Sequence, residues 1–202
     1  MITVVGWPRS GTHWMKTMIE CALGEELAHA HAYPESVGDQ YILMVRDPRD
    51  VLASHWRLYE RAYPGKQTEL GFVESFLEGK GPNQHKWNLG WVAYTGKLLE
   101  WNERNPQHTS LVRYERLYEA PGITLARTLV GIGRYDPWRW RISRAVRFTW
   151  GRRCDPSDLP VDGNMGRPGK WAVHLAAPTV QAVLAYCGPV MSELGYLGKA
   201  PT

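Results

Sequence analysis

The stretch that decides the fold is Gly6-Trp7-Pro8-Arg9-Ser10-Gly11-Thr12-His13-Trp14, near the start of a 202-residue chain. A short β-branched run, Ile2–Val5, precedes it, and a helical pattern of apolar residues over 12–23 follows it. A strand, a glycine-containing loop and a helix in this order form the first half of a β-α-β unit. Because ligands of open α/β sheets bind beyond the carboxyl ends of the strands, this loop is a candidate phosphate site.

The loop has the glycine spacing of a Walker A motif without its other parts. Gly6 and Gly11 fit G-x-x-x-x-G, but Thr12-His13 stands where that motif has lysine and a metal-binding hydroxyl. Backbone N–H groups at a helix N-terminus still bind anions, and Arg9 inside the loop can hold an anionic oxygen with two hydrogen bonds. The loop therefore predicts an anion site that works without a metal ion. A glycine- and proline-containing turn between any strand and any helix is the competing interpretation.

Later segments continue the alternation of strands and helices. We expect a short, ambiguous strand within 26–33, a buried strand over 41–45, a helix from Pro48 through Leu58, an amphipathic piece at 70–77, a helix over 87–104, a strand over 110–114, a helix over 123–132, and a last helix with a break or kink at Gly188-Pro189. The pattern predicts an α/β protein with a three-layer P-loop-like fold, in which helices flank a central, mainly parallel sheet.

Composition limits the class of protein. Apolar residues make up 44% and charged residues 22%, which predicts one globular domain over residues 1–202. The net charge of +4 suits an anionic ligand and is too small to indicate DNA binding. Cys21, Cys154 and Cys187 form no metal-binding pattern, and no apolar stretch approaches the roughly 20 residues of a membrane helix. We expect a cytoplasmic protein without structural zinc, a membrane span or a nucleic-acid partner.

A second polar cluster follows the strand at 41–45. It reads Arg46-Asp47-Pro48-Arg49-Asp50-Val51-Leu52-Ala53-Ser54. Arg46 ends the strand and Ser54 lies two helical turns further on, so both side chains can reach one anion at the sheet edge. Taken alone, the cluster is better explained by a structural Arg46–Asp50 ion pair with Ser54 as a small packing residue.

The two clusters together resemble the cytosolic-type sulfotransferase family, which uses 3′-phosphoadenosine 5′-phosphosulfate (PAPS). Residues 7–14 match the family pattern Tyr-Pro-Lys-Ser-Gly-Thr-x-Trp, with Arg9 in place of lysine, and 46–54 match Arg-x-Pro-x-Asp-x-x-x-Ser. Tyr114-Glu115 is similar to the family's Tyr-Glu-Asp, and 166–171 is a weaker match to its C-terminal Arg-Lys-Gly-x-x-Gly-x-Trp. The resemblance covers most of the chain, with gaps.

The resemblance implies a set of donor-binding residues, with PAPS as donor, adenosine 3′,5′-bisphosphate (PAP) as product and no metal. Arg46 and Ser54 would hold the 3′-phosphate, while Trp14, Tyr114 and Trp150 would contact the adenine. The 5′-phosphosulfate would be bound by the loop residues Pro8, Arg9, Ser10, Gly11, Thr12 and His13. The position of the leading arginine of the last motif is taken by Asn164, so the resemblance implies that Arg167 or Lys170, next to Gly169, would supply the missing charge, or that the 3′-phosphate would be held by fewer contacts.

The resemblance also implies a histidine base between the first loop and the second strand. The candidates are His29 and His31 in His29-Ala-His31-Ala-Tyr33-Pro34, and we favour His31, which is nearer the proline. Arg9 cannot readily donate a proton, so its expected catalytic role is electrostatic.

The acceptor is left open by the sequence. The chain is shorter than typical family members, so we expect an open acceptor site built from the loops 63–90 and 156–169. Such a site would admit a small molecule, glycan, lipid or natural product carrying a hydroxyl or amine. A homo-oligomer is compatible with the sequence.

Two other functions remain open at this point. A P-loop kinase or other nucleoside-triphosphate enzyme would carry a Walker lysine and a carboxylate for Mg²⁺. A non-catalytic nucleotide- or polyanion-binding module would use the arginine-rich segment 134–153.

Overall fold

The computed structural model describes residues 1–34, 36, 39–78, 90–134, 139–150 and 166–197. The chain divides into two compact units. The first unit consists of Met1–Arg46 and Leu98–Arg167, and the second unit of Asp47–Lys97 and Pro168–Thr202.

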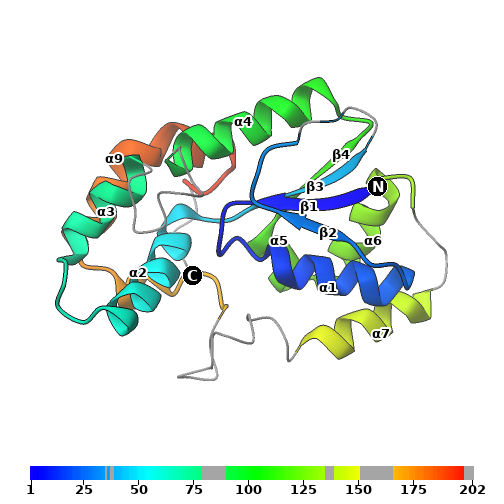
Figure 1. Cartoon of the computed structure of the whole chain (residues 1–202), viewed down its shortest axis with the longest axis horizontal. Coiled ribbons are helices and arrows are strands. Elements are labelled where there is room, and N and C mark those ends of the chain that lie inside the picture. Colours follow the sequence, from blue (N-terminus) through cyan, green and yellow to red (C-terminus); the bar gives the residue numbers. More distant parts are fainter. Residues whose placement is uncertain (35, 37–38, 79–89, 135–138, 151–165, 198–202) are drawn as a thin grey trace. The chain divides into compact units, whose positions relative to one another are not determined.

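A four-stranded parallel sheet forms the centre of the first unit (Figure 1). Its strands are β1 (Ile2–Gly6), β2 (Ala28–Ala30), β3 (Gln40–Val45) and β4 (Thr109–Arg113), in the order β2-β1-β3-β4. Val4 pairs with His29 on one side and Ile42 on the other, and Met44 pairs with Val112. The parallel sheet flanked by helices confirms the predicted fold class.

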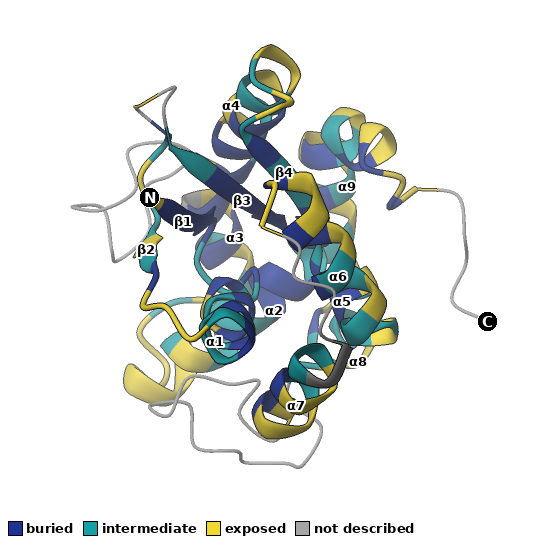
Figure 2. Ribbon diagram, turned by 90° about the vertical axis from the view of Figure 1, so that its right-hand side faces the viewer, coloured by how far each residue is buried: buried dark blue, intermediate teal, exposed yellow. Residues whose placement is uncertain are grey.

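Four helices of the first unit follow these strands: α1 (Thr12–Leu23), α5 (Tyr114–Glu119), α6 (Pro121–Gly131) and α7 (Arg139–Trp150). Helices α1, α6 and α7 pack on one another, and Figure 2 shows that α7 has a buried and an exposed side. Their buried faces share a core with strand residues that point to the same side of the sheet, namely Ile2, Val4, Ile42, Met44 and Val112. On the opposite side Tyr41 contacts Trp101, at 6.1 Å between ring centroids.

The second unit is helical. It contains α2 (Pro48–Ala62), α3 (Glu69–Glu78), α8 (Trp171–His174) and α9 (Ala177–Glu193), and α4 (Trp91–Arg104) passes from it into the first unit. Asp47 caps α2 by accepting a hydrogen bond from the Arg49 N–H at 2.9 Å, and Pro48 takes the first helical position, where its missing N–H costs nothing. Trp56 of α2 packs on Phe72 of α3, with ring centroids 5.4 Å apart.

Three local predictions are wrong. The strand expected to include Tyr114 ends at Arg113, and the unpredicted helix α5 begins at Tyr114, whose spacing from Leu117 buries both residues on one side. Helix α2 runs to Ala62 rather than Leu58. Of the break or kink expected at Gly188-Pro189, the break is wrong: helix α9 continues through it, because burial of Val183, Cys187 and Met191 outweighs the one backbone hydrogen bond that Pro189 lacks.

Candidate functional site

The loop between β1 and α1 has an unusual backbone. The Ser10 N–H donates to the Trp7 carbonyl at 3.1 Å, and Arg9 and Gly11 have φ angles of 70° and 86°. Among the described residues, Arg9 is the non-glycine residue with a positive φ. A bulky residue in this region is uncommon in proteins, and such strained residues concentrate at functional sites.

Glycine is required at position 11 both because the φ angle is positive and because a side chain there would collide with a neighbouring ring. A Cβ atom there would lie 2.3 Å from Cδ2 of Tyr114, a buried ring. We expect Gly11→Ala to displace this ring and to abolish anion binding by the loop, with a larger loss of stability than the about 1–2 kcal/mol of a left-handed alanine. Denaturant unfolding and titration with inorganic sulfate measure the two effects.

Gly24→Ala is the matched control for Gly11. Gly24 has a φ of 75°, and its Cβ would meet no atom of the described residues within 4 Å. Its loss of stability should be limited to the backbone cost, and anion binding by the loop should not change. Equal behaviour of the two variants would show that the contact with Tyr114 is unimportant.

Arg46 links the end of β3 to this loop. Its Nη1 donates to the Arg9 carbonyl at 2.9 Å, which holds the strained residue in place. Its guanidinium carbon lies 4.2 Å from the centroid of the Tyr114 ring, and the residue is 7% exposed. Arg46 therefore stabilises the loop conformation besides supplying positive charge.

Two buried polar atoms at the loop have no hydrogen-bond partner among the described residues: Ser10 Oγ and Arg46 Nε. Buried polar groups are almost always paired, so unpaired donors in one place indicate a ligand. Both atoms can donate to an oxyanion, as can the backbone N–H groups that begin α1. Ser10 Oγ and these N–H groups fit one phosphate or sulfate group, and Arg46 Nε can donate to a second anionic group of the same ligand.

Three aromatic residues of the predicted adenine site are in contact. The Trp14 ring lies 6.0 Å from Tyr114 and 5.8 Å from Trp150, edge to face in both pairs. Trp14 is fully buried and donates from Nε1 to Thr149 Oγ1 at 3.2 Å, while Tyr114 donates from its hydroxyl to the Gly166 carbonyl at 2.6 Å. Trp150 is 37% exposed, so it is the ring of the three that a ligand can reach without rearrangement.

The two candidate base histidines both contact the loop region. His31 Nδ1 lies 2.7 Å from the Gly6 carbonyl, and His29 Nε2 lies 2.9 Å from Thr12 Oγ1. Because a carbonyl oxygen only accepts, Nδ1 of His31 carries the proton and Nε2 is the nitrogen that can take another. The two rings are 4.6 Å apart between centroids. Burial raises the pKa of nearby Tyr33 to about 12, so this hydroxyl stays protonated at neutral pH.

The remaining predicted donor residues are distributed over both units. In the first unit, Pro8 is half-buried, Thr12 is buried, and His13 and Arg167 are exposed. In the second unit, Ser54 of α2 and Lys170 are half-buried and Gly169 is exposed. Asn164 and most of the predicted loop 156–169 lie outside the described residues. Within the described part of the chain, no three His, Cys, Asp or Glu side chains gather as metal ligands would.

A model of the sulfotransferase domain matches residues 28–129, which is half of the chain. The chain belongs to the sulfotransferase family. The match begins after the first loop, so the interpretation of residues 6–14 rests on their sequence and geometry. Family membership makes the chain a sulfotransferase, and it removes the kinase and the non-catalytic module as leading alternatives.

Solved sulfotransferase structures share the fold. The mouse sulfotransferase SULT7A1 complexed with PAP has a TM-score of 0.71 at 19% identity, over 95% of this chain and 88% of that chain. Retinol dehydratase in complex with androsterone and PAP has a TM-score of 0.66 at 14% identity, over 95% of this chain and 80% of that chain. Retinol dehydratase in a complex with retinol and PAP has a TM-score of 0.69 at 12% identity, over 99% of this chain and 83% of that chain. No curated protein sequence matches the chain significantly.

The sequence did not reveal several contacts of this sulfotransferase. Thr149 and Gly166 hold Trp14 and Tyr114, and neither had a sequence signal of its own. Asp50 was visible as a member of the 46–54 motif, but its backbone partners were not.

Proposed function

We propose that this sulfotransferase takes its sulfuryl group from PAPS, passes it to an acceptor hydroxyl or amine, and releases PAP. The hydrogen bond between His31 Nδ1 and the Gly6 carbonyl carries this proposal, because it fixes a proton-accepting histidine at the edge of an anion-binding loop. The three similar solved structures contain PAP, which supports the same nucleotide here.

The donor-binding roles follow the two clusters. Ser10 Oγ, Thr12 and the N–H groups that begin α1 would hold the 5′-phosphosulfate, and Pro8 and His13 border them. Arg46, with Ser54, would hold the 3′-phosphate through its unpaired buried Nε. Trp150 would stack on the adenine, and Trp14, which packs edge to face on both Trp150 and Tyr114, would hold the Trp150 ring in place. Arg167, Gly169 and Lys170 would complete the 3′-phosphate site.

His31 would act as the general base. Nε2 would take the proton of the acceptor hydroxyl while Nδ1 keeps its hydrogen bond to Gly6, so the ring orientation does not change during transfer. Arg9 would stabilise the negative charge that develops on the leaving phosphate, since a guanidinium remains charged throughout. His29, which is hydrogen-bonded to Thr12, would stabilise the end of the loop, and it remains the alternative base.

Compartment, assembly and acceptor belong to the same proposal. The described cysteines, Cys21 and Cys187, are free, which suits the cytoplasm. No helix among the described residues is long and apolar enough to cross a membrane. The acceptor would be a small molecule, lipid, natural product or glycan received by an open site near 63–90 and 156–169. Assembly as a homo-oligomer remains part of this proposal.

The reverse reaction tests the function without knowledge of the natural acceptor. PAP and p-nitrophenyl sulfate should give PAPS and p-nitrophenolate, whose absorbance is followed with time. The rate should be high with PAP and low with AMP, which lacks the 3′-phosphate. Binding of PAP without any release of p-nitrophenolate, at all protein concentrations, would contradict transfer through PAPS.

A further inference from the structure

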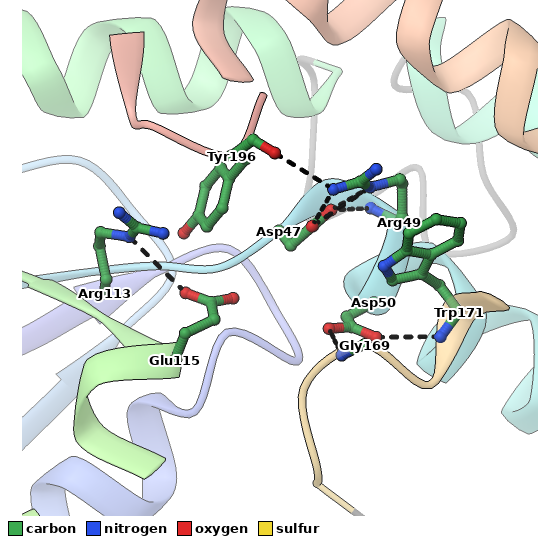
Figure 3. A network of polar contacts seen from close by, with 8 residues as sticks. All are labelled: Asp47, Arg49, Asp50, Arg113, Glu115, Gly169, Trp171 and Tyr196. Atoms are coloured by element: carbon green, nitrogen blue, oxygen red, sulfur yellow. Dashed lines mark hydrogen bonds and ion pairs between the residues drawn. The ribbon is translucent and has the colours of Figure 1, made fainter. Parts of the chain in front are cut away.

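Asp50 binds the backbone of a distant turn in the second unit. It lies in the first turn of α2 and is 3% exposed. Its Oδ2 accepts from the Gly169 N–H at 2.8 Å and its Oδ1 from the Trp171 N–H at 3.1 Å (Figure 3). A buried carboxylate without hydrogen-bond donors is costly, so these two hydrogen bonds stabilise Asp50 in its buried position.

Arg49 holds the same turn through the Trp171 side chain. Its guanidinium carbon lies 4.2 Å from the Trp171 ring centroid, and Nη2 forms an ion pair with Asp47 at 2.6 Å. Nη2 also lies 3.4 Å from the Tyr196 carbonyl. The stacked arginine is thus fixed on both sides, and Figure 3 shows it above the indole ring.

The conformation of the turn explains why a carboxylate binds there. Gly169 is left-handed with a φ of 81°, and Lys170 follows in the right-handed helical region at φ −71° and ψ −15°. Consecutive residues of this kind direct their N–H groups toward one anion. Here the carboxylate of Asp50 is that anion. Lys170 lies between Gly169 and Trp171, whose N–H groups bind the carboxylate, so its backbone is held in place.

We propose that Asp50 is a positioning residue for recognition of the donor's 3′-phosphate. It fixes the backbone of Lys170 relative to Ser54, which lies four residues after Asp50 on the same side of α2. Asp50 does not contact the nucleotide itself. The proposal rests on the proposed function, in which Ser54 and Lys170 bind the 3′-phosphate.

Asp50→Asn tests this role, since the amide keeps the shape but accepts only one of the two hydrogen bonds. By calorimetry, we expect the Kd of PAP to rise about tenfold and the Kd of AMP, which lacks the 3′-phosphate, to stay nearly constant. Amide exchange by NMR should become faster at Gly169 and Trp171.

Glu69→Gln is the matched control for Asp50→Asn. Glu69 also lies in the first turn of a helix and accepts a backbone N–H of the C-terminal segment, from Ala176 at 2.9 Å. It should leave the Kd values of PAP and AMP unchanged. Gly169→Ala strains the same turn without removing a buried charge, because its Cβ would meet no described atom within 4 Å. Gly169→Ala should also raise the Kd of PAP while leaving the Kd of AMP nearly constant.

The outcomes distinguish failure of the proposed function from failure of the role proposed for Asp50. If the wild-type protein does not prefer PAP over AMP, the proposed function fails. If it does, and both Asp50→Asn and Gly169→Ala keep the full preference or weaken PAP and AMP equally, Asp50 is only a structural anchor and the inference is overturned.

Discussion

His31→Gln should lower kcat for sulfuryl transfer by about 10²–10⁴-fold, the usual contribution of a general base. Glutamine can still donate to the Gly6 carbonyl, which His31 Nδ1 reaches at 2.7 Å, but it cannot take a proton from the acceptor. Binding of PAP should therefore stay within a few-fold of wild type. Steady-state kinetics of the reverse reaction and calorimetry with PAP measure the two quantities.

His29→Gln is the control for this substitution. His29 lies in β2, two residues before His31, contacts the loop region through Thr12 and packs on the His31 ring, so its variant removes a similar side chain without removing the proposed base. It should lower kcat much less than His31→Gln. The opposite order, with His31→Gln active and His29→Gln inactive, would assign the base to His29.

Arg46→Ala should weaken PAP binding by about a hundredfold. The substitution removes a charged donor to the ligand and the hydrogen bond that holds the strained Arg9 carbonyl, and each charged hydrogen bond contributes about 1.5–3 kcal/mol. Arg46→Lys restores the charge but not the paired, planar geometry, so it should recover only part of the affinity. Calorimetric titration with PAP gives both values.

Arg104→Ala controls for the loss of one positive charge. Arg104 is exposed and pairs with Glu100 on the surface of α4, and it is not among the proposed donor-binding residues. Its variant should bind PAP as the wild type does. If Arg46→Ala and Arg104→Ala lowered the affinity for PAP to the same small extent, Arg46 would act only through the net charge of the protein.

The sequence predicted the part of the fold that local patterns determine. The strand, the loop and the helix over 2–23 were recognisable because a β-branched run, two glycines and a helical period lie next to one another. Helix α5 was not, because Tyr114–Glu119 is short and continues directly from β4. Whether such a segment is strand or helix depends on what covers Tyr114 and Leu117, and the local sequence does not contain that information.

The same division holds for the candidate site. The loop and Arg46 could be placed together because parallel strands bring their carboxyl ends to one edge, whereas the two histidines were assigned to the site only through the resemblance to the sulfotransferase family. The supporting contacts could not, since Trp14 and Thr149 are separated by 135 residues, and Asp50 and Gly169 by 119. Such contacts depend on the packing of α1 against α7 and of α2 against the C-terminal turn.

Thermal stabilisation by three nucleotides tests the assignment of the donor most directly. The melting temperature should rise with PAP, much less with AMP, and no more with ATP and Mg²⁺ than with AMP, because only PAP carries the 3′-phosphate that Arg46 and Ser54 are proposed to bind. Equal shifts with all three nucleotides, or a larger shift with ATP and Mg²⁺, would contradict a sulfotransferase site for PAPS in this loop.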